Sequence, residues 1–188
     1  MNKILVVVDM QNDFIDGVLG TPEAQAIVPK VVEKIENWDG SVVTTQDFHT
    51  DIYLSTQEGK RLPIEHCMYD THGLEFNNLV QVAVKAKTES INRYYKTGFG
   101  CESLVKDLSE FSEHGERFGL SIDEIHLCGL CTDICVLANA ITIKTFCPEI
   151  RIVVDASCCA GTTPEAHEIA LKAMRQCQID IENWEFGA

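Results

Sequence analysis

The sequence predicts an α/β fold with an open, parallel sheet of six strands. Apolar runs rich in β-branched residues alternate along the chain with segments whose apolar residues recur at helical spacing. The first run, KILVVVD at residues 3–9, is continuously apolar, as expected for a central parallel strand covered on both faces. Strands that alternate with helices in this way form open parallel sheets. No repeat, low-complexity linker or compositional break divides the chain, so we expect a single domain, residues 1–188.

The remaining elements follow from periodicity and from helix start signals. Strands are expected at residues 3–9, 40–47, 79–86, 122–130, 149–156 and 178–184. Helices are expected at residues 21–38, 101–111, 132–144 and 163–177. Thr21 takes a capping position before Pro22, although Pro29 is expected to weaken or divide this helix near its start. Residues 48–77 are polar and irregular, and so long an irregular stretch in a small domain usually serves function.

The charge and cysteine content narrow the functional classes. A formal net charge of -14 disfavours nucleic acid, membrane surfaces and strongly anionic substrates as partners. The apolar run at residues 4–8 is too short for a signal peptide or a membrane span. Nine cysteines without a secretory signal favour a reducing compartment, and an odd number prevents complete pairing. We therefore expect a cytoplasmic protein with free thiols.

Polar side chains follow several of the expected strands. Asp9 closes the first strand, Asp47 closes the second, and a segment with three cysteines, CGLCTDICV, follows the fourth. Ligands of open parallel sheets bind beyond the carboxyl ends of the strands, and these ends share one rim. An acidic residue at a strand end is most often only a cap or a loop anchor. Its meaning therefore depends on its neighbours.

The three cysteines in residues 128–135 allow four interpretations: metal ligands, a redox pair, buried packing or one reactive thiolate. A structural metal cluster needs four ligands, and the other cysteines supply no second C-x2-C pair. Cys128 falls inside an apolar strand, where cysteine behaves as a small hydrophobe. Cys131 and Cys135 have three residues between them, whereas a thioredoxin-type motif has two. A redox role for that pair stays open as an alternative.

Cys135 is the candidate nucleophile. Gly129 permits a tight turn from strand to helix, which places Cys135 in the first turn of the helix. There the helix dipole favours a thiolate, and free backbone N–H groups could hold an oxyanion. Lys96, within RYYKTGFG at residues 93–100, is a candidate cation for stabilising this thiolate. The alternatives are a buried structural cysteine and an ordinary surface lysine.

Three stretches together resemble the isochorismatase-like cysteine hydrolases: VVVDMQNDF with Asp9 and Phe14, YYKTGFG with Lys96, and GLCTDICV with Cys135. The resemblance implies an Asp9–Lys96–Cys135 catalytic triad in a three-layer α-β-α sandwich with a Rossmann-like six-stranded sheet. It also implies a cis peptide between Leu130 and Cys131, with an oxyanion hole formed by the backbone N–H groups of Cys131 and Cys135.

Residues 47–67 carry a second set of polar side chains. Asp47 and His49 are two residues apart, and His66 precedes a cysteine. A carboxylate with two imidazoles suits a divalent transition metal, with zinc first and iron or manganese as alternatives. Two histidines without a ligand role are the alternative interpretation. This D-x-H pattern followed by His-Cys resembles the pyrazinamidase/nicotinamidase group, in which the metal binds the pyridine nitrogen.

The resemblance implies a metal-dependent amidohydrolase that converts nicotinamide to nicotinate and ammonia through a thioester on Cys135. The residues expected to contact the substrate are Phe14, Tyr95 and Leu130. Another small amide remains an alternative substrate, because Tyr53, Leu54 and Ser55 stand where many nicotinamidases carry a further histidine. A non-catalytic metal-binding scaffold on the same fold is a second alternative. We also expect a homo-oligomer.

Overall fold

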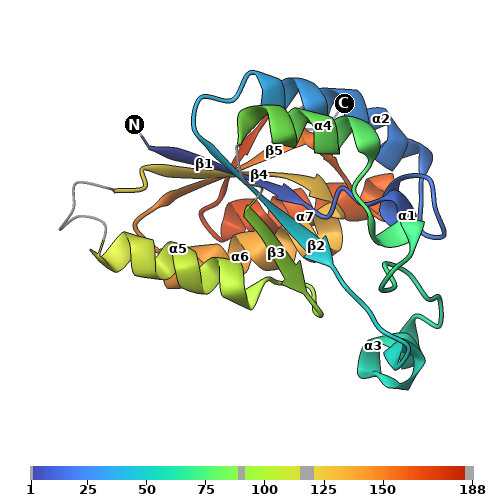
Figure 1. Ribbon diagram of the computed structural model, residues 1–188. Coiled ribbons are helices and arrows are strands. Elements are labelled where there is room, and N and C mark those ends of the chain that lie inside the picture. The colour runs from blue at the N-terminus through green and yellow to red at the C-terminus, as the bar shows by residue number, and fades with distance from the viewer. Residues whose placement is uncertain (1, 89–91, 115–120, 185–188) are drawn as a thin grey trace.

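The computed structural model describes residues 2–88, 92–114 and 121–184, and shows one parallel sheet between two layers of helices (Figure 1). The strands are β1 (Lys3–Val8), β2 (Ser41–Asp47), β3 (Asn92–Lys96), β4 (Glu124–Leu130), β5 (Arg151–Ala160) and β6 (Asp180–Glu182). Their order across the sheet is β3-β2-β1-β4-β5-β6, and every pair is parallel. The expected three-layer α/β fold is confirmed.

The helices lie on both faces of the sheet. They are α1 (Asn12–Ile15), α2 (Pro22–Glu36), α3 (Gln57–Arg61), α4 (Asn78–Lys87), α5 (Glu102–His114), α6 (Leu137–Phe146) and α7 (Pro164–Gln176). Helices α2 and α4 cover one face, and α5, α6 and α7 cover the other (Figure 1). Thr21 caps α2 by accepting a 3.0 Å hydrogen bond from Ala24 N, and the helix continues unbroken through Pro29.

Residues 79–86 form most of α4, so the prediction of a third strand there was wrong. The apolar residues of LVQVAVKA alternate, but Val80, Ala83 and Val84 also share one helix face, and that face is buried. Asn77 sets the start of the helix because its side chain accepts a hydrogen bond from Leu79 N at 3.0 Å. The third strand is instead Asn92–Lys96, and Lys96 is its last residue.

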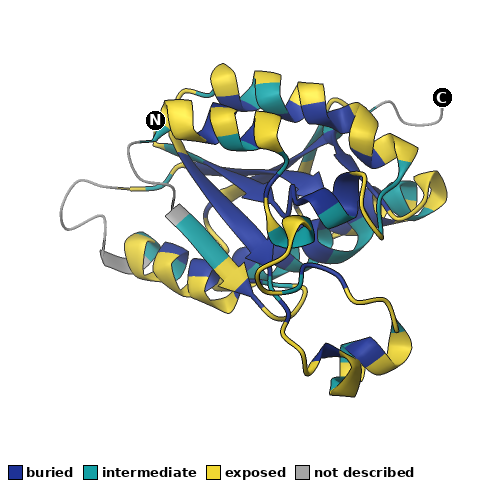
Figure 2. Cartoon of the chain, turned by 45° about the vertical axis from the view of Figure 1, so that its right-hand side comes forward, coloured by how far each residue is buried: buried dark blue, intermediate teal, exposed yellow. Residues whose placement is uncertain are grey.

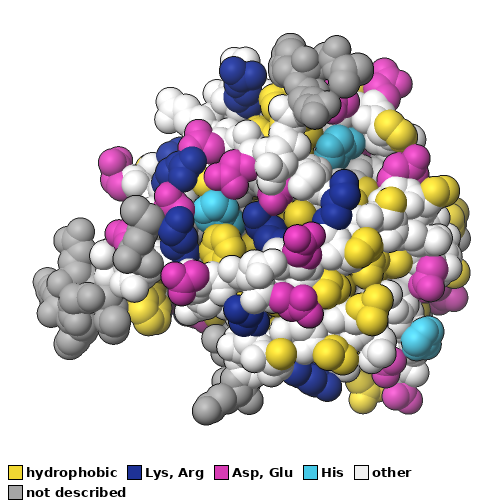
Figure 3. Space-filling model, turned by 90° about the horizontal axis from the view of Figure 1, so that it is seen from above, with side chains coloured by type: hydrophobic (Ala, Val, Ile, Leu, Met, Phe, Trp, Pro, Cys, Tyr) yellow, Lys and Arg dark blue, Asp and Glu magenta, His cyan; other side chains and the backbone are white. Residues whose placement is uncertain are grey.

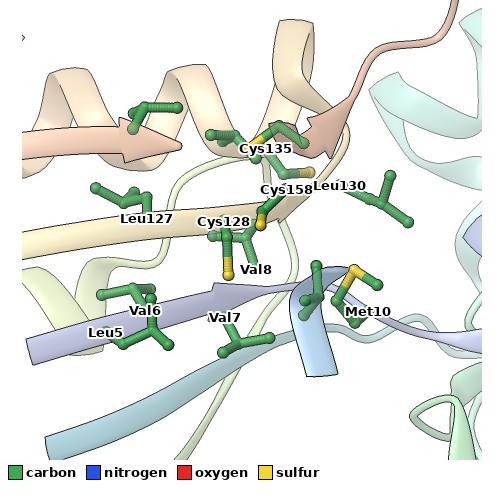
Figure 4. Packing of buried hydrophobic residues seen from close by; sticks show 14 of the residues in the cluster. Leu5, Val6, Val7, Val8, Met10, Leu127, Cys128, Leu130, Cys135 and Cys158 are labelled. Atoms are coloured by element: carbon green, nitrogen blue, oxygen red, sulfur yellow. The ribbon is translucent and has the colours of Figure 1, made fainter. Parts of the chain in front are cut away.

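The core lies against the central strands β1 and β4. Every residue of β4 is buried, as are Leu5 to Val8 of β1, whereas the outer helices have both buried and exposed faces (Figure 2). Cys128 is fully buried on β4 and lies among apolar side chains that include Val8 (Figure 4). Its predicted packing position is confirmed. The strand order reverses between β1 and β4, and ligands bind at such reversal points in open sheets.

Two features of the exterior bear on function. The segment with α3 projects beyond the carboxyl ends of the strands, away from the layered body (Figures 1 and 2). On the face covered by α2 and α4, lysine and arginine side chains are interspersed with acidic ones (Figure 3). Among the described residues, no helix combines the length and apolar character needed to cross a membrane.

Candidate active site

Three adjacent strands bring the predicted polar residues together at one rim of the sheet. Asp9 follows β1, Asp47 is the last residue of β2, and Lys96 is the last residue of β3. Asp47 and Lys96 are register partners across the β2–β3 pair. All three side chains are buried. The parallel register therefore places two carboxylates and one ammonium side by side, as the sequence predicted for this rim.

The Lys96 ammonium is the centre of this group. Its Nζ lies 2.8 Å from Asp9 Oδ2 and 3.2 Å from Asp47 Oδ1. The same Nζ donates a hydrogen bond to Cys135 Sγ at 3.4 Å. Thr45 fixes the other oxygen of Asp9 by donating a hydrogen bond to Oδ1 at 2.7 Å. One cation thus contacts both carboxylates and the thiol of the candidate nucleophile.

For both Asp9 and Lys96, burial shifts the pKa in one direction and the charge of the partner shifts it in the other. Burial raises the pKa of the Asp9 carboxyl above its ordinary value, although Lys96 acts in the opposite direction. Burial lowers the pKa of Lys96, but the charges of Asp9, Cys135 and Asp47 outweigh it and raise that pKa. Lys96 therefore stays protonated at neutral pH. A proton acceptor with a raised pKa beside a fixed cation is an arrangement suited to proton transfer.

Cys135 lies on a turn between β4 and α6. The peptide bond between Leu130 and Cys131 is cis, as the family resemblance implies, and residues Thr132–Val136 form a π-helical turn before α6. Cys135 is 6% exposed and lies beside the carboxyl end of β4 (Figure 4). Burial first, and then the charge of Asp9, raise the pKa of its thiol well above the ordinary value. The thiol therefore needs a nearby proton acceptor in order to react.

A second cluster of ligand atoms adjoins the Lys96 contacts. Asp47, His49, Glu58 and His66 each place one oxygen or nitrogen within 4.8 Å of the others. Asp47 Oδ2 lies 3.1 Å from His49 Nε2 and 3.5 Å from His66 Nε2. Sequence reasoning missed Glu58, which the short helix α3 carries to within 4.0 Å of His66 Nε2. No spacing marks Glu58, because only the folded segment brings α3 next to the strand ends.

The donor chemistry of this cluster fits a divalent transition metal. His66 Nδ1 pairs with the Ile64 carbonyl at 2.8 Å, which leaves Nε2 on the side of Asp47. Burial opposes the charge of Asp47, but hydrogen bonds from His49 and His66, followed by the Lys96 charge, hold its pKa below the ordinary value. One ionised carboxylate with two imidazoles and a second carboxylate is a set that zinc, iron or manganese would accept.

The predicted substrate-contacting residues are distributed differently. Phe14 packs edge-on against His66, with ring centroids 5.5 Å apart, so it borders the metal-ligand cluster. Leu130 is fully buried and precedes the turn that carries Cys135. Tyr95 is 52% exposed and contacts Phe48, because neighbouring residues of a strand face opposite sides and Lys96 faces inward. The structure does not bring Tyr95 together with the other predicted site residues.

Comparison with known proteins extends this description. A model of the isochorismatase domain matches residues 3–186. The structure of pyrazinamidase from Pyrococcus horikoshii in complex with zinc is similar, with a TM-score of 0.76 and 26% identity over 98% of this chain and 100% of that one. The structure of nicotinamidase/pyrazinamidase PncA from Bacillus subtilis is also similar, with a TM-score of 0.75 and 30% identity over 96% of this chain and 99% of that one. Nicotinamidase/pyrazinamidase from Mycobacterium tuberculosis is 25% identical, over 95% of this chain and 97% of its own. The chain belongs to the isochorismatase domain family.

Proposed function

We propose that this protein is a cysteine amidohydrolase that deaminates nicotinamide to nicotinate and ammonia. The observation that carries the proposal is the position of Lys96 Nζ, 2.8 Å from Asp9 and 3.4 Å from Cys135 Sγ, beside a set of metal-ligand atoms. A scaffold without catalysis would have no use for a buried acid, cation and thiol in contact. The names of the similar proteins, nicotinamidase and pyrazinamidase, support an aromatic carboxamide as the substrate class.

The first half of the reaction forms a thioester. Asp9 accepts the Cys135 thiol proton, and Lys96 stabilises the resulting thiolate. The thiolate adds to the amide carbonyl carbon, and the backbone N–H groups of Cys131 and Cys135 hold the oxyanion. Asp9 then donates its proton to the leaving nitrogen as the C–N bond breaks, which releases ammonia. The raised pKa of Asp9 suits both steps, since the same carboxyl must take up and release a proton.

The second half restores the enzyme. Asp9 accepts a proton from a water molecule that adds to the thioester carbonyl. The intermediate collapses with cleavage of the C–S bond, and the carboxylic acid leaves. Asp9 then returns its proton to the Cys135 thiolate, which restores the carboxylate and the thiol. Lys96 again supplies the positive charge beside this thiolate, at the 3.4 Å contact described above.

Asp47, His49 and His66 would hold a divalent metal, with Glu58 as a fourth ligand. A bound metal would supply a Lewis-acid contact for the ring nitrogen of the pyridine substrate. Phe14, which packs against His66, would then lie next to that ring. Asp47 would serve both parts of the site, because its Oδ2 faces the imidazoles and its Oδ1 faces Lys96.

A different small amide is a second candidate substrate. The residues just before His66 are Leu62, Pro63, Ile64 and Glu65, so this stretch lacks an aromatic ring for stacking on a pyridine. The ligand cluster contains Glu58 rather than a third histidine. A panel that includes nicotinamide, pyrazinamide and aliphatic amides separates the two candidates by their relative kcat/KM.

The direct test of the proposal is ammonia release from nicotinamide, with and without a chelator. We expect turnover that the chelator abolishes and added zinc restores. Turnover that is unaffected by the chelator would remove the metal from the proposal. No ammonia from any amide of the panel would overturn the hydrolase assignment itself.

The nucleophile is tested by a matched pair of cysteine variants. Cys135→Ala is expected to abolish turnover and the covalent acyl label seen by mass spectrometry. Cys131→Ala keeps its backbone N–H, so we expect it to retain turnover within about an order of magnitude. The reverse pattern would assign the nucleophile to Cys131.

A further inference from the structure

The turn that carries Cys135 is tied to the start of α7 on the side away from Lys96. Thr132 is fully buried, and its Oγ1 lies 2.8 Å from His167 Nδ1. His167 is in the first turn of α7, and its backbone N–H donates to the Thr163 carbonyl at 3.0 Å. Burial lowers the pKa of His167, so its imidazole is uncharged at neutral pH and can accept the Thr132 hydroxyl hydrogen.

A second contact reinforces the first. Asp133 accepts two hydrogen bonds from Thr162, from its backbone N at 2.8 Å and from its Oγ1 at 2.6 Å. The preceding residue, Gly161, leaves room for this approach. A Cβ at position 161 would lie 2.9 Å from Asp133 Oδ1 and 2.7 Å from His167 N. The loop between β5 and α7 is therefore fitted closely against the first two residues of the turn.

These contacts leave a clear division of roles within the turn. The side chains of Thr132 and Asp133 are engaged with α7 and its preceding loop, whereas Cys135 Sγ faces Lys96. The Cys131 carbonyl accepts hydrogen bonds from Ile134 N and Val136 N, both at 3.1 Å, which closes the turn on itself. The position of the turn relative to Lys96 is thus set from the α7 side.

We propose that His167, acting through Thr132, is a positioning residue that fixes the backbone N–H groups of the oxyanion hole. The inference rests on the proposed function, since only acyl transfer requires that hole. Displacement of reacting groups by about 1 Å costs on the order of 100-fold in rate. Loss of one oxyanion donor costs about 100- to 1000-fold in kcat. Loss of the contact between Thr132 and His167 should therefore make the turn more mobile and reduce kcat. KM should stay nearly constant, because the substrate contacts elsewhere are unchanged.

The test compares two reactions of the same thiol in His167→Ala. Amide hydrolysis is expected to lose about 10- to 100-fold in kcat, with KM within about two-fold of wild type. Alkylation of Cys135 by iodoacetamide forms a C–S bond, expels iodide and passes the thiol proton to Asp9. That reaction builds no oxyanion, so its rate should stay within about two-fold of wild type. A variant that merely lost structure would change both reactions together.

Two further variants separate positioning from folding. His167→Asn can place a side-chain amide atom close to Nδ1 and is expected to recover most of kcat. Thr132→Val keeps the buried volume but removes the hydroxyl, and should reproduce the kcat loss of His167→Ala. The two losses should not add in the double variant, because both break one contact. Ile169→Ala, at an exposed position of α7, is the matched control and should match wild type.

The outcomes distinguish this inference from the proposed function. An unchanged kcat in both His167→Ala and Thr132→Val would overturn the positioning role and leave the hydrolase intact. Equal losses in hydrolysis and alkylation would also overturn it. If the wild-type protein hydrolysed no amide, the proposed function would fail. Wild-type backbone hydrogen exchange at residues 131–136 in His167→Ala would then overturn the positioning role as well.

Discussion

The two ends of the parallel sheet both gather ionisable side chains, but they use them differently. At the carboxyl ends, Lys96 is 5% exposed and contacts the buried carboxylates of Asp9 and Asp47 as well as the Cys135 thiol. At the amino ends, Glu124 contacts two cations, with Lys3 at 2.8 Å and Arg151 at 2.7 Å. The side chain of Lys3 is 33% exposed and that of Arg151 is 47% exposed.

The two clusters differ in how fully the charges of their carboxylates are offset by cations. At the amino ends, one carboxylate has several partners, and water reaches the cations, so the cluster is an ordinary network of ion pairs. At the carboxyl ends, two buried carboxylates share one lysine, which also contacts the Cys135 thiol. Buried charge without full local balance is costly and is typical of functional sites. Paired variants at the two ends should therefore have unequal effects.

Removal of a carboxylate gives the largest expected contrast. Asp9→Asn cannot accept the Cys135 proton, so amide hydrolysis should fall by about three to four orders of magnitude. Glu124→Gln, at the amino end of β4, should hydrolyse amides at a rate within about two-fold of wild type. Steady-state ammonia release measures both. Comparable losses in the two variants would mean that the carboxyl-end cluster has no special role in catalysis.

Removal of a lysine should reduce the unfolding free energy of the protein much more at the carboxyl ends of the strands than at their amino ends. In the metal-free protein, Lys96→Met leaves Asp9 and Asp47 buried without the ammonium they share and should cost about 3–5 kcal/mol of unfolding free energy. Lys3→Met removes one of several exposed partners of Glu124 and should cost less than about 1 kcal/mol. Urea denaturation followed by circular dichroism measures the difference. A stable Lys96→Met protein at pH 7 would contradict the charge assignment of the buried pair.

Removal of a histidine at the carboxyl ends of the strands should weaken zinc binding, whereas removal of one at their amino ends should leave it unchanged. His66→Ala deletes a predicted ligand and should weaken zinc affinity by at least about 100-fold. Glu58→Gln should weaken it by about 10-fold, since the amide keeps a neutral oxygen donor. His126→Ala, whose imidazole contacts Glu124 at 3.0 Å, is the control and should bind zinc as wild type does. Competition with a zinc-binding dye reports these affinities without any turnover.

Local pattern predicted the fold and the strand ends that carry Asp9 and Asp47, whereas only the family resemblance implies the triad, which stays a proposal. The β-branched runs predicted the four inner strands β1, β2, β4 and β5, because buried parallel strands leave a continuous apolar signature, and the edge strand β6 was also predicted. The edge strand β3, NRYYK, is short and polar and carries no such signature. The alternating valines of residues 79–86 predicted a strand, although the residues that are buried there lie at helical spacing. Glu58 joins the ligand cluster, and His167 contacts the turn that carries Cys135, only through tertiary contacts that no sequence spacing encodes.

The smallest expected contrast concerns acid stability at the amino ends. Hydrogen bonds from Lys3, His126 and Arg151 lower the pKa of Glu124 to about 2 from an ordinary value of 4.5. A carboxyl whose pKa is lower in the folded state stabilises the fold above its unfolded pKa. That contribution is lost as the pH falls through the folded pKa. Because its cations are partly exposed, we expect Glu124→Gln to cost only about 1 kcal/mol at pH 7.

The pH dependence of this cost tests its origin. Urea titrations at pH 7, 4.5, 3 and 2 should show that the difference in unfolding free energy between wild type and Glu124→Gln is constant down to about pH 4.5. It should then shrink as the pH falls and leave only a small remainder at pH 2, where Glu124 is protonated in the unfolded state and about half protonated in the folded state. A difference that keeps its pH 7 size at pH 2 would assign the cost to packing instead. Glu149→Gln, an exposed change in the loop between α6 and β5, should show no difference at any of these pH values.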